Sequence, residues 1–234
     1  MLSFRIFSWH RPARDEGRPG VSAIFTARLR YYSSASPYLI LLVDNGSSSC
    51  KILEEELRRL EPEIVTLTHD SIGPPQISRY SGVVVSGRAV PSNDSNIHNS
   101  RIVMASYENN VPMLGVCFGG EILATTFGAT LRRLPAGLKE SRVITVIKEN
   151  KLLSEVSFVA REAHQFRIGT LPSSLERLAI SAISDNEAVK HAHAEMYGVQ
   201  FHPELSGESG RLILANFVRI CRQKNRGTQR ERSD

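Results

Sequence analysis

The strongest constraint on the fold is a wholly apolar run, Leu-Ile-Leu-Leu-Val at residues 39–43, which is followed by Asp44-Asn45-Gly46. A strand with one face in water alternates apolar and polar residues, whereas a strand buried on both faces of a parallel sheet does not alternate. Both faces are buried only when other elements cover both sides of the sheet. The run therefore predicts a central strand of a layered α/β fold.

Strand-like and helix-like segments alternate along the first half of the chain. A helix is predicted after Ser47 or Ser48, either of which would cap it, because leucines recur there with helical spacing at 53, 57 and 60. Further predicted strands cover 64–68, 83–85 and 112–116, a polar loop covers 91–100, and predicted helices cover 99–108 and 119–127. This order is typical of an open, doubly wound, mostly parallel sheet with flanking helices.

The second half is richer in strands and ends in a helix. Predicted strands cover 143–148, 175–182, 188–192 and 196–201. A helix from about Glu208 places Leu214, Phe217 and Val218 on one face together with Cys221. This pattern predicts that Cys221 is a thiol of the hydrophobic core.

Basic residues are concentrated at the two ends of the chain. Of the net charge of +5, residues 1–37 contribute +4 and residues 222–234 contribute +3, so residues 38–221 carry −2. We interpret 1–37 as an N-terminal extension, which is a targeting segment, a disordered arm or a misassigned start, and 222–234 as a disordered basic tail. The mildly acidic body indicates no nucleic-acid partner, and no run approaches the ~20 apolar residues of a membrane span.

The chain has three cysteines, Cys50, Cys117 and Cys221, without the paired spacing of a disulfide framework or a zinc motif. This usage favours a reducing compartment, and we predict a cytoplasmic location. His191 and His193 occupy alternate positions of a predicted strand, where we expect both to be exposed and to lack a third ligand. We therefore predict no metal site and no cofactor.

One segment combines a strand end, a cysteine and a helix start. Residues 115–119 read Gly-Val-Cys-Phe-Gly, which has the form of a nucleophile elbow with Cys117 at its tip. We expect Cys117 to have a strained backbone, with glycines where side chains would collide. The helix N-terminus is expected to lower the pKa of the thiol, and the backbone N–H of Phe118 to face a developing oxyanion.

A second segment supplies a base. Residues 198–204 read Gly-Val-Gln-Phe-His-Pro-Glu and end a predicted strand. Glu204 lies two residues after His202, and Pro203 restricts the backbone between them. A carboxylate in this position can orient the imidazole and stabilise its charged form, which completes a nucleophile, base and orienter set with Cys117.

The two segments together resemble the class I (triad) glutamine amidotransferases over about residues 38–221. The resemblance implies that Cys117 attacks the side-chain amide of glutamine, with His202 as proton carrier and Glu204 as its orienter. Ser86-Gly87 is similar to the loop of this family that helps to form the oxyanion hole. Gly87 and Phe118 are therefore the implied backbone donors.

Three short segments are similar to the glutaminase subunit of GMP synthase, namely 44–46, 162–164 and 187–191. This branch implies a separate ATP pyrophosphatase synthetase that acts on xanthosine monophosphate and takes up the ammonia. The chain is too short to carry that synthetase as well, so we expect it to be another polypeptide.

Four residues depart from the family pattern, one of them Gly120, which stands where the family usually has histidine. Arg88 stands where the oxyanion loop usually has glycine, and Phe166 stands where the synthase-like segment would carry an aspartate near His164. Glu121 replaces the glutamine that helps to hold the substrate. Glu121 is therefore our predicted substrate-binding residue, through the ammonium group of glutamine. These departures leave two alternatives open, a stand-alone γ-glutamyl amide hydrolase and a non-catalytic binding homologue.

Overall fold

A computed structural model of the chain describes residues 38–61 and 63–231, and side chains as far as residue 224. The expectations for residues 1–37 lie outside the described residues and stay predictions. Among the helices of the described part, none is long and apolar enough to cross a membrane.

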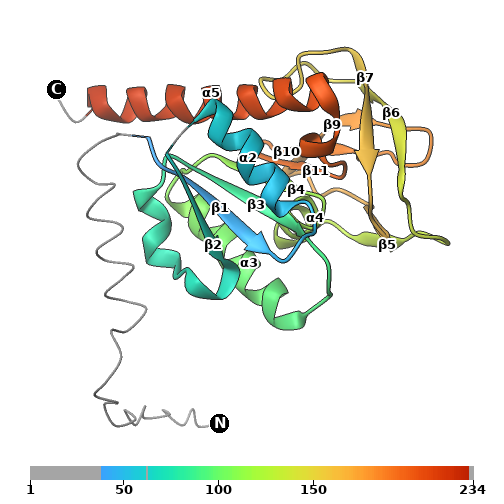
Figure 1. Cartoon of the computed structure of the whole chain (residues 1–234), viewed down its shortest axis with the longest axis horizontal. Coiled ribbons are helices and arrows are strands. Elements are labelled where there is room, and N and C mark those ends of the chain that lie inside the picture. Colours follow the sequence, from blue (N-terminus) through green and yellow to red (C-terminus); the bar gives the residue numbers. More distant parts are fainter. Residues whose placement is uncertain (1–37, 62, 232–234) are drawn as a thin grey trace, which may run out of the picture. The chain divides into compact units, whose positions relative to one another are not determined.

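A central sheet of nine strands organises the described part of the chain (Figure 1). In spatial order the strands are β2 (Ile64–Thr68), β1 (Ile40–Asn45), β3 (Gly82–Arg88), β4 (Met113–Val116), β11 (Met196–Val199), β10 (Ala188–His191), β9 (Leu175–Ile180), β6 (Glu140–Val146) and β7 (Ser157–Glu162). The strands from β2 to β11 pair in parallel, and those from β11 to β7 pair antiparallel. The predicted α/β sheet is confirmed, with an antiparallel extension on one side.

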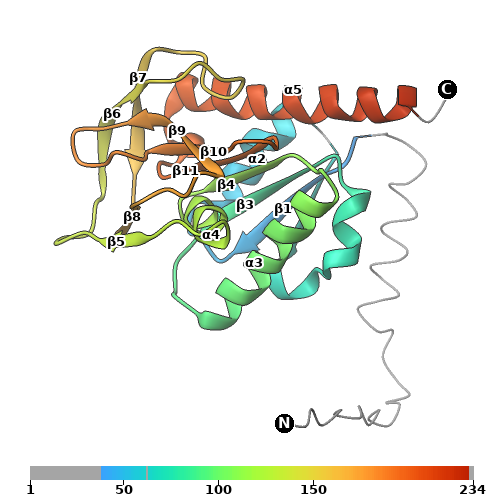
Figure 2. The same ribbon diagram turned by 180° about the vertical axis from the view of Figure 1, so that it is seen from behind.

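Helices cover both faces of the parallel part, as seen in Figures 1 and 2. Helices α2 (Cys50–Leu60) and α5 (Gly207–Glu231) pack on one face, and α3 (Asn93–Glu108) and α4 (Phe118–Thr126) pack on the other. Ile40 and Leu42 of β1 point into the first layer, whereas Leu41 and Val43 point into the second. All four side chains are buried, each worth about 1.5–3 kcal/mol. The absence of alternation in β1 thus reflects two covered faces.

The antiparallel half contains strands that the sequence pattern does not reveal. The hairpin of β6 and β7 leaves one face open, so that Val143 and its cross-strand partner Val159 are both 56% exposed. The run predicted at 143–148 belongs to β6, and β7 was not predicted. A second sheet pairs β5 (Leu131–Arg133) with β8 (Phe166–Ile168), and these three-residue strands are too short to give a period.

Two predicted boundaries are wrong. The segment 91–100 is not a loop, because α3 begins at Asn93, where the Ser92 hydroxyl accepts the backbone N–H of Ser95. The polar first turn of this helix resembles a loop in composition. Helix α5 continues to Glu231 through most of the predicted tail, since an established helix extends readily through Arg, Lys and Gln. Short 3₁₀ helices also occur, namely η1 (His69–Ser71), η2 (Pro74–Arg79) and η3 (Pro203–Leu205).

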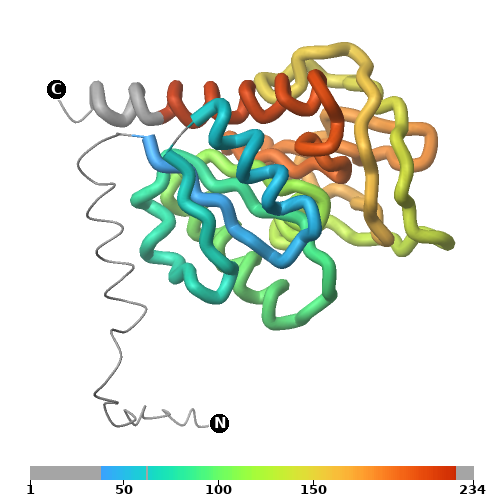
Figure 3. The backbone as a smooth tube through the Cα atoms, in the orientation of Figure 1, coloured from blue at the N-terminus to red at the C-terminus, as the bar shows by residue number. Residues whose placement is uncertain are grey.

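The strand order brings three distant segments to one edge of the sheet. Strands β3, β4 and β11 are consecutive neighbours and parallel, so their carboxyl ends lie side by side. Gly87 lies near the end of β3, Cys117 directly follows β4 and His202 lies three residues after β11. Figure 3 shows the course of the backbone through this part of the fold. This edge is where open α/β sheets bind ligands.

Candidate active site

Cys117 lies between β4 and α4 in the strained conformation that the elbow predicts. Its φ of 52° and ψ of −108° lie outside the regions that side-chain-bearing residues prefer, which costs about 1–3 kcal/mol. A Cβ atom on Gly115 would lie 2.3 Å from the carbonyl carbon and oxygen of Gly119. A Cβ atom on Gly119 would lie 2.2 Å from the carbonyl oxygen of Val85 in β3. Both glycines are therefore required by close packing.

The thiol of Cys117 is buried beside a carboxylate. Its sulfur lies 3.7 Å from the carbonyl oxygen of Ala163, to which it donates. Burial raises the pKa of Cys117, the nearby carboxylate of Glu121 raises it further, and the backbone N–H of Phe118 lowers it by a smaller amount. The expected net lowering of the thiol pKa by the helix N-terminus is wrong for the substrate-free site. The thiol is protonated there because desolvation outweighs the helix dipole.

His202 and Glu204 are in direct contact. His202 Nδ1 lies 2.8 Å from Glu204 Oε1, and both side chains are buried. Because an ionised carboxylate only accepts hydrogen bonds, Nδ1 carries the proton of the neutral ring and Nε2 offers a lone pair. Nε2 is buried without a hydrogen-bond partner among the described residues. This is the tautomer that a general base needs.

Backbone contacts bring the two predicted segments together. The N–H of Cys117 donates to the carbonyl oxygen of Val199 at 2.8 Å, because β4 and β11 pair in register. The N–H of His202 donates to the carbonyl oxygen of Arg161 at 2.7 Å, two residues before the carbonyl that accepts the Cys117 thiol. The end of β7 and the residue that follows it therefore contact both His202 and Cys117.

Ser49 is a site residue that the sequence reasoning missed. Its hydroxyl donates to Glu204 Oε1 at 2.6 Å and lies 3.4 Å from His202 Nδ1. The predicted cap of α2 by Ser47 or Ser48 is also wrong, because Ser49 occupies the N-cap position and makes no side-chain cap bond. No sequence signal links Ser49 to a residue that is 155 positions away. The fold alone supplies that information.

The predicted oxyanion loop lies next to the histidine. A Cβ atom on Gly87 would lie 3.3 Å from His202 Cε1 and from the Ser47 hydroxyl, so a side chain there would crowd the ring. The Ser86 hydroxyl accepts the backbone N–H of Asn45 at 3.0 Å and donates to the carbonyl of Gly87 at 2.9 Å. These bonds hold the peptide that precedes Arg88 in one orientation.

A pocket of about 220 Å³ opens in front of the thiol. Its lining consists of Arg88, Ala89, Pro91, Cys117, Phe118, Glu121, Ala163, His164, Gln165 and Phe166. Glu121 is buried, accepts from Gln200 Nε2 at 3.5 Å, and has a pKa raised by that burial. The Arg88 guanidinium lies 3.9 Å from the centre of the Phe118 ring. The pocket therefore presents an anion and a cation beside the nucleophile.

The other two cysteines are buried as well. Cys50 is buried, and its pKa is raised to about 12 chiefly by desolvation. Cys221 is 1% exposed in the core, as predicted, where its sulfur would lie 2.3 Å from a Cβ on Gly82.

The expectation that His191 is exposed is wrong, because its ring packs against Tyr107 and Phe127 with centroid distances of 4.8 and 4.5 Å.

Comparisons with known proteins show the family to which this chain is similar. The family model "Glutamine amidotransferase class-I" matches residues 41–221. The chain is 30% identical over 188 residues to the glutamine-hydrolysing GMP synthase subunit of Methanococcus vannielii, with 78% of this chain and 97% of the relative covered. It is 32% identical over 191 residues to the protein of the same name from Pyrococcus furiosus, with 78% of this chain and 98% of the relative covered.

Solved structures show the same fold. A Thermoplasma acidophilum protein proposed to be a subunit of GMP synthase matches with a TM-score of 0.76 at 24% identity, over 83% of this chain and 99% of that one. A glutamine amidotransferase of Thermotoga maritima matches with a TM-score of 0.63 at 18% identity, over 81% of this chain and 86% of that one. With the family model covering most of the chain, the protein belongs to the class I glutamine amidotransferases.

Proposed function

We propose that this protein hydrolyses the side-chain amide of glutamine and supplies the ammonia to a separate synthetase of the GMP synthase type. The observation that carries the proposal is the placement of Cys117 and the His202–Glu204 pair at the ends of adjacent parallel strands. The names of the relatives support the choice of synthetase, because this chain covers 97–98% of the length of those subunits.

In the proposed reaction, His202 Nε2 takes the proton of Cys117, and the sulfur attacks the amide carbon of glutamine. The oxyanion that forms accepts hydrogen bonds from the backbone N–H groups of Gly87 and Phe118. His202 then gives its proton to the departing ammonia, which leaves a γ-glutamyl thioester on Cys117. A water molecule, deprotonated by His202, cleaves the thioester and releases glutamate while the sulfur regains its proton.

Two charged residues are proposed to select the substrate. Glutamine carries an α-ammonium and an α-carboxylate, and the pocket offers the Glu121 carboxylate and the Arg88 guanidinium. An ammonium beside Glu121 offsets the charge that disfavours the Cys117 thiolate. Substrate binding thus lowers the pKa of the thiol at the moment when a nucleophile is needed.

A second candidate function is a stand-alone hydrolase of γ-glutamyl amides. Arg88 favours it, because its Nη1 donates to Asn96 Oδ1 at 2.5 Å and ties the oxyanion loop to α3 without a partner. In this alternative the site turns over glutamine or a related amide at full rate by itself.

Ammonia release with and without a partner separates the candidates. We expect slow glutamine turnover by the purified chain, and a rise of at least ~10-fold, or ~1.4 kcal/mol of barrier, with an ATP pyrophosphatase synthetase, ATP and xanthosine monophosphate. Omission of xanthosine monophosphate is the control and should remove most of the rise. Fast turnover by the chain alone, unchanged by the partner, would favour the stand-alone hydrolase. No turnover under either condition would favour a binding homologue.

A further inference from the structure

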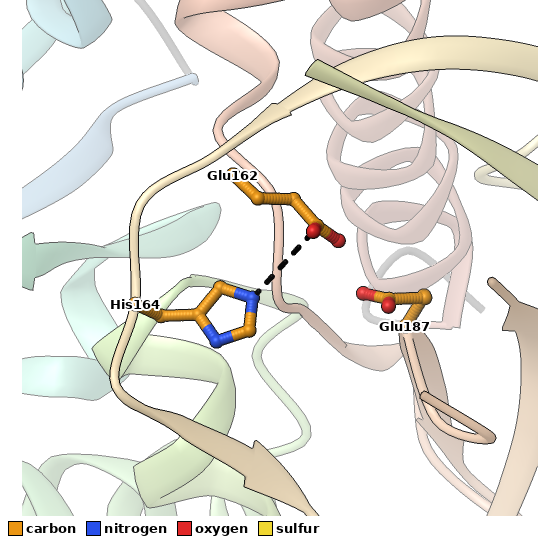
Figure 4. A group of neighbouring side chains, drawn as sticks. All are labelled: Glu162, His164 and Glu187. Atoms are coloured by element: carbon orange, nitrogen blue, oxygen red, sulfur yellow. Dashed lines mark ion pairs between the residues drawn. The ribbon is translucent and has the colours of Figure 1, made fainter. Parts of the chain in front are cut away.

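A second group of buried ionisable residues adjoins the pocket, which one of them, His164, also lines. Glu162 ends β7, His164 follows it, and Glu187 lies one residue before β10 (Figure 4). Both carboxylate residues are 0% exposed, and the His164 side chain is 1% exposed. Figure 4 shows the two carboxylates and the imidazole turned toward a common centre. One ligand atom from each residue lies within 4.8 Å of the others.

The hydrogen bonds around His164 fix its tautomer. Nδ1 lies 2.7 Å from the carbonyl oxygen of Phe166. A carbonyl only accepts, so Nδ1 carries a proton, and Nε2 of the neutral ring presents a lone pair to the carboxylates. Within the described part of the chain, Nε2, both oxygens of Glu162 and Oε2 of Glu187 are buried without a hydrogen-bond partner. Lone pairs that face one another away from water require a cation between them.

The distance between His164 and Glu162 favours a metal ion over a proton shared by these two residues. A proton shared between His164 Nε2 and Glu162 Oε2 would bring them to about 2.7–3.2 Å, whereas they lie 4.0 Å apart. No two of the three ligand atoms are more than 4.8 Å apart, so a single point can lie within about 2.8 Å of all three. Metal–ligand distances are about 2.0–2.6 Å, so small side-chain movements complete the coordination.

We propose that Glu162, His164 and Glu187 bind one divalent transition-metal ion, with Zn²⁺ as the first candidate. One imidazole and two carboxylates are typical ligands of zinc and leave a position for water. The outer contacts suit this role, because Nδ1–H of His164 donates to a carbonyl and the Ser181 hydroxyl donates to Glu187 Oε1 at 2.6 Å. The positive charge of the ion offsets the negative charges of the two carboxylates.

Arg142 is the cation that already faces this group. Its Nε lies 3.3 Å from Glu162 Oε2, and its guanidinium also pairs with Glu140 at the surface. Arg142 therefore balances one of the two buried carboxylates, through the same Oε2 atom that lies 4.0 Å from His164 Nε2. His164 Nε2 and Glu187 Oε2, which have no hydrogen-bond partner within the described part of the chain, are left for the ion.

The position of the ion gives it a structural part in the active site. Ala163 lies between two of the ligands, and its carbonyl accepts the Cys117 thiol. Fixing Glu162 and His164 therefore fixes the backbone that borders the nucleophile. The ion acts through this segment and not on the substrate, so metal binding is measured independently of glutaminase activity.

The test is the metal content of the full chain after incubation with Zn²⁺ and removal of unbound ion. We expect about one zinc per chain, and a loss of at least ~10-fold in zinc affinity in Glu187→Gln and in His164→Gln. Glu176→Gln and His193→Gln are matched controls, because both side chains lie outside the cluster, and they should keep the ion. Cys117→Ala should also keep it, since the thiol is not a ligand.

X-ray absorption of the zinc-loaded wild-type chain tests the ligands without any variant. The expected first shell holds one imidazole nitrogen and oxygen atoms at about 2.0–2.2 Å and no sulfur. The proposal is overturned by a wild-type chain that retains no zinc, by a sulfur shell at about 2.3 Å, or by equal zinc content in wild type and both cluster variants. Failure to retain zinc would mean that a proton occupies the cluster, and would leave the proposed glutaminase reaction unaffected.

Discussion

At the residue scale, the contact between Glu121 and the Cys117 thiol decides how the substrate-free site behaves. Burial raises the pKa of the Cys117 thiol above that of an ordinary cysteine, and the neighbouring Glu121 carboxylate raises it further. The position that the family fills with a neutral amide here carries a negative charge. An ammonium group beside Glu121, such as that of an amino acid, is therefore expected to favour the thiolate.

This contact predicts the pH dependence of alkylation. Because the pKa of the thiol is raised, its thiolate fraction keeps increasing with pH, so carbamidomethylation of Cys117 in the substrate-free chain should accelerate throughout pH 7–9. Glu121→Gln removes the charge and should speed alkylation at pH 7 by ~3–10-fold while raising the KM for glutamine. A rate that is already constant at pH 7, measured by mass spectrometry of the Cys117 peptide, would contradict the raised pKa.

Ser49 gives a second prediction at this scale. Its hydroxyl donates to Glu204 Oε1, so Ser49→Ala removes one bond from the carboxylate that orients His202. A hydrogen bond to a charged group is worth about 1.5–3 kcal/mol, of which we expect about half to appear in the barrier, or a ~5-fold lower kcat. Ser48→Ala is the matched control, because Ser48 is the exposed neighbour. Equal kcat values for the two variants would remove Ser49 from the network.

At the scale of elements, the elbow depends on how closely α4 approaches the sheet. Gly119→Ala places a Cβ atom 2.2 Å from the carbonyl of Val85, so β3 and α4 must separate. We expect a loss of about 2–4 kcal/mol in the free energy of unfolding, seen as a Tm lower by about 5 °C or more. Gly73→Ala is the control, because the nearest atom to the added Cβ atom is 3.7 Å away, and its Tm should stay near that of the wild type. Similar Tm values for both variants would contradict the close approach.

The helices and strands also show which parts of the fold a sequence pattern can predict. Strand β1 could be predicted because burial on both faces leaves a continuous apolar run, and α2 because its leucines recur with helical spacing. Strands β5 and β8 could not, because three residues carry no period. The first turn of α3 was missed because a polar, exposed turn has the composition of a loop.

At the scale of the whole molecule, the candidate site is built from segments that only the sheet order brings together. The motifs around Cys117 and His202 could be predicted, since each is local and the physics of the elbow is carried by neighbouring glycines. Ser49 could not be predicted, because its partner lies on a distant strand end. Likewise, Glu162, His164 and Glu187 appear in the sequence as separate short matches, and their convergence depends on β7 and β10.

The central claim is that Cys117 is the nucleophile for a glutamine-like substrate, and covalent labelling tests it most directly. A chloroketone analogue of glutamine presents the same α-ammonium and α-carboxylate to Glu121 and Arg88 and an alkylating carbon to the thiol. We predict labelling at Cys117 alone, with glutamine protecting it, and no labelling of the Cys117→Ala variant. Labelling at Cys50 or Cys221, or labelling of Cys117 that glutamine does not slow, would contradict the account.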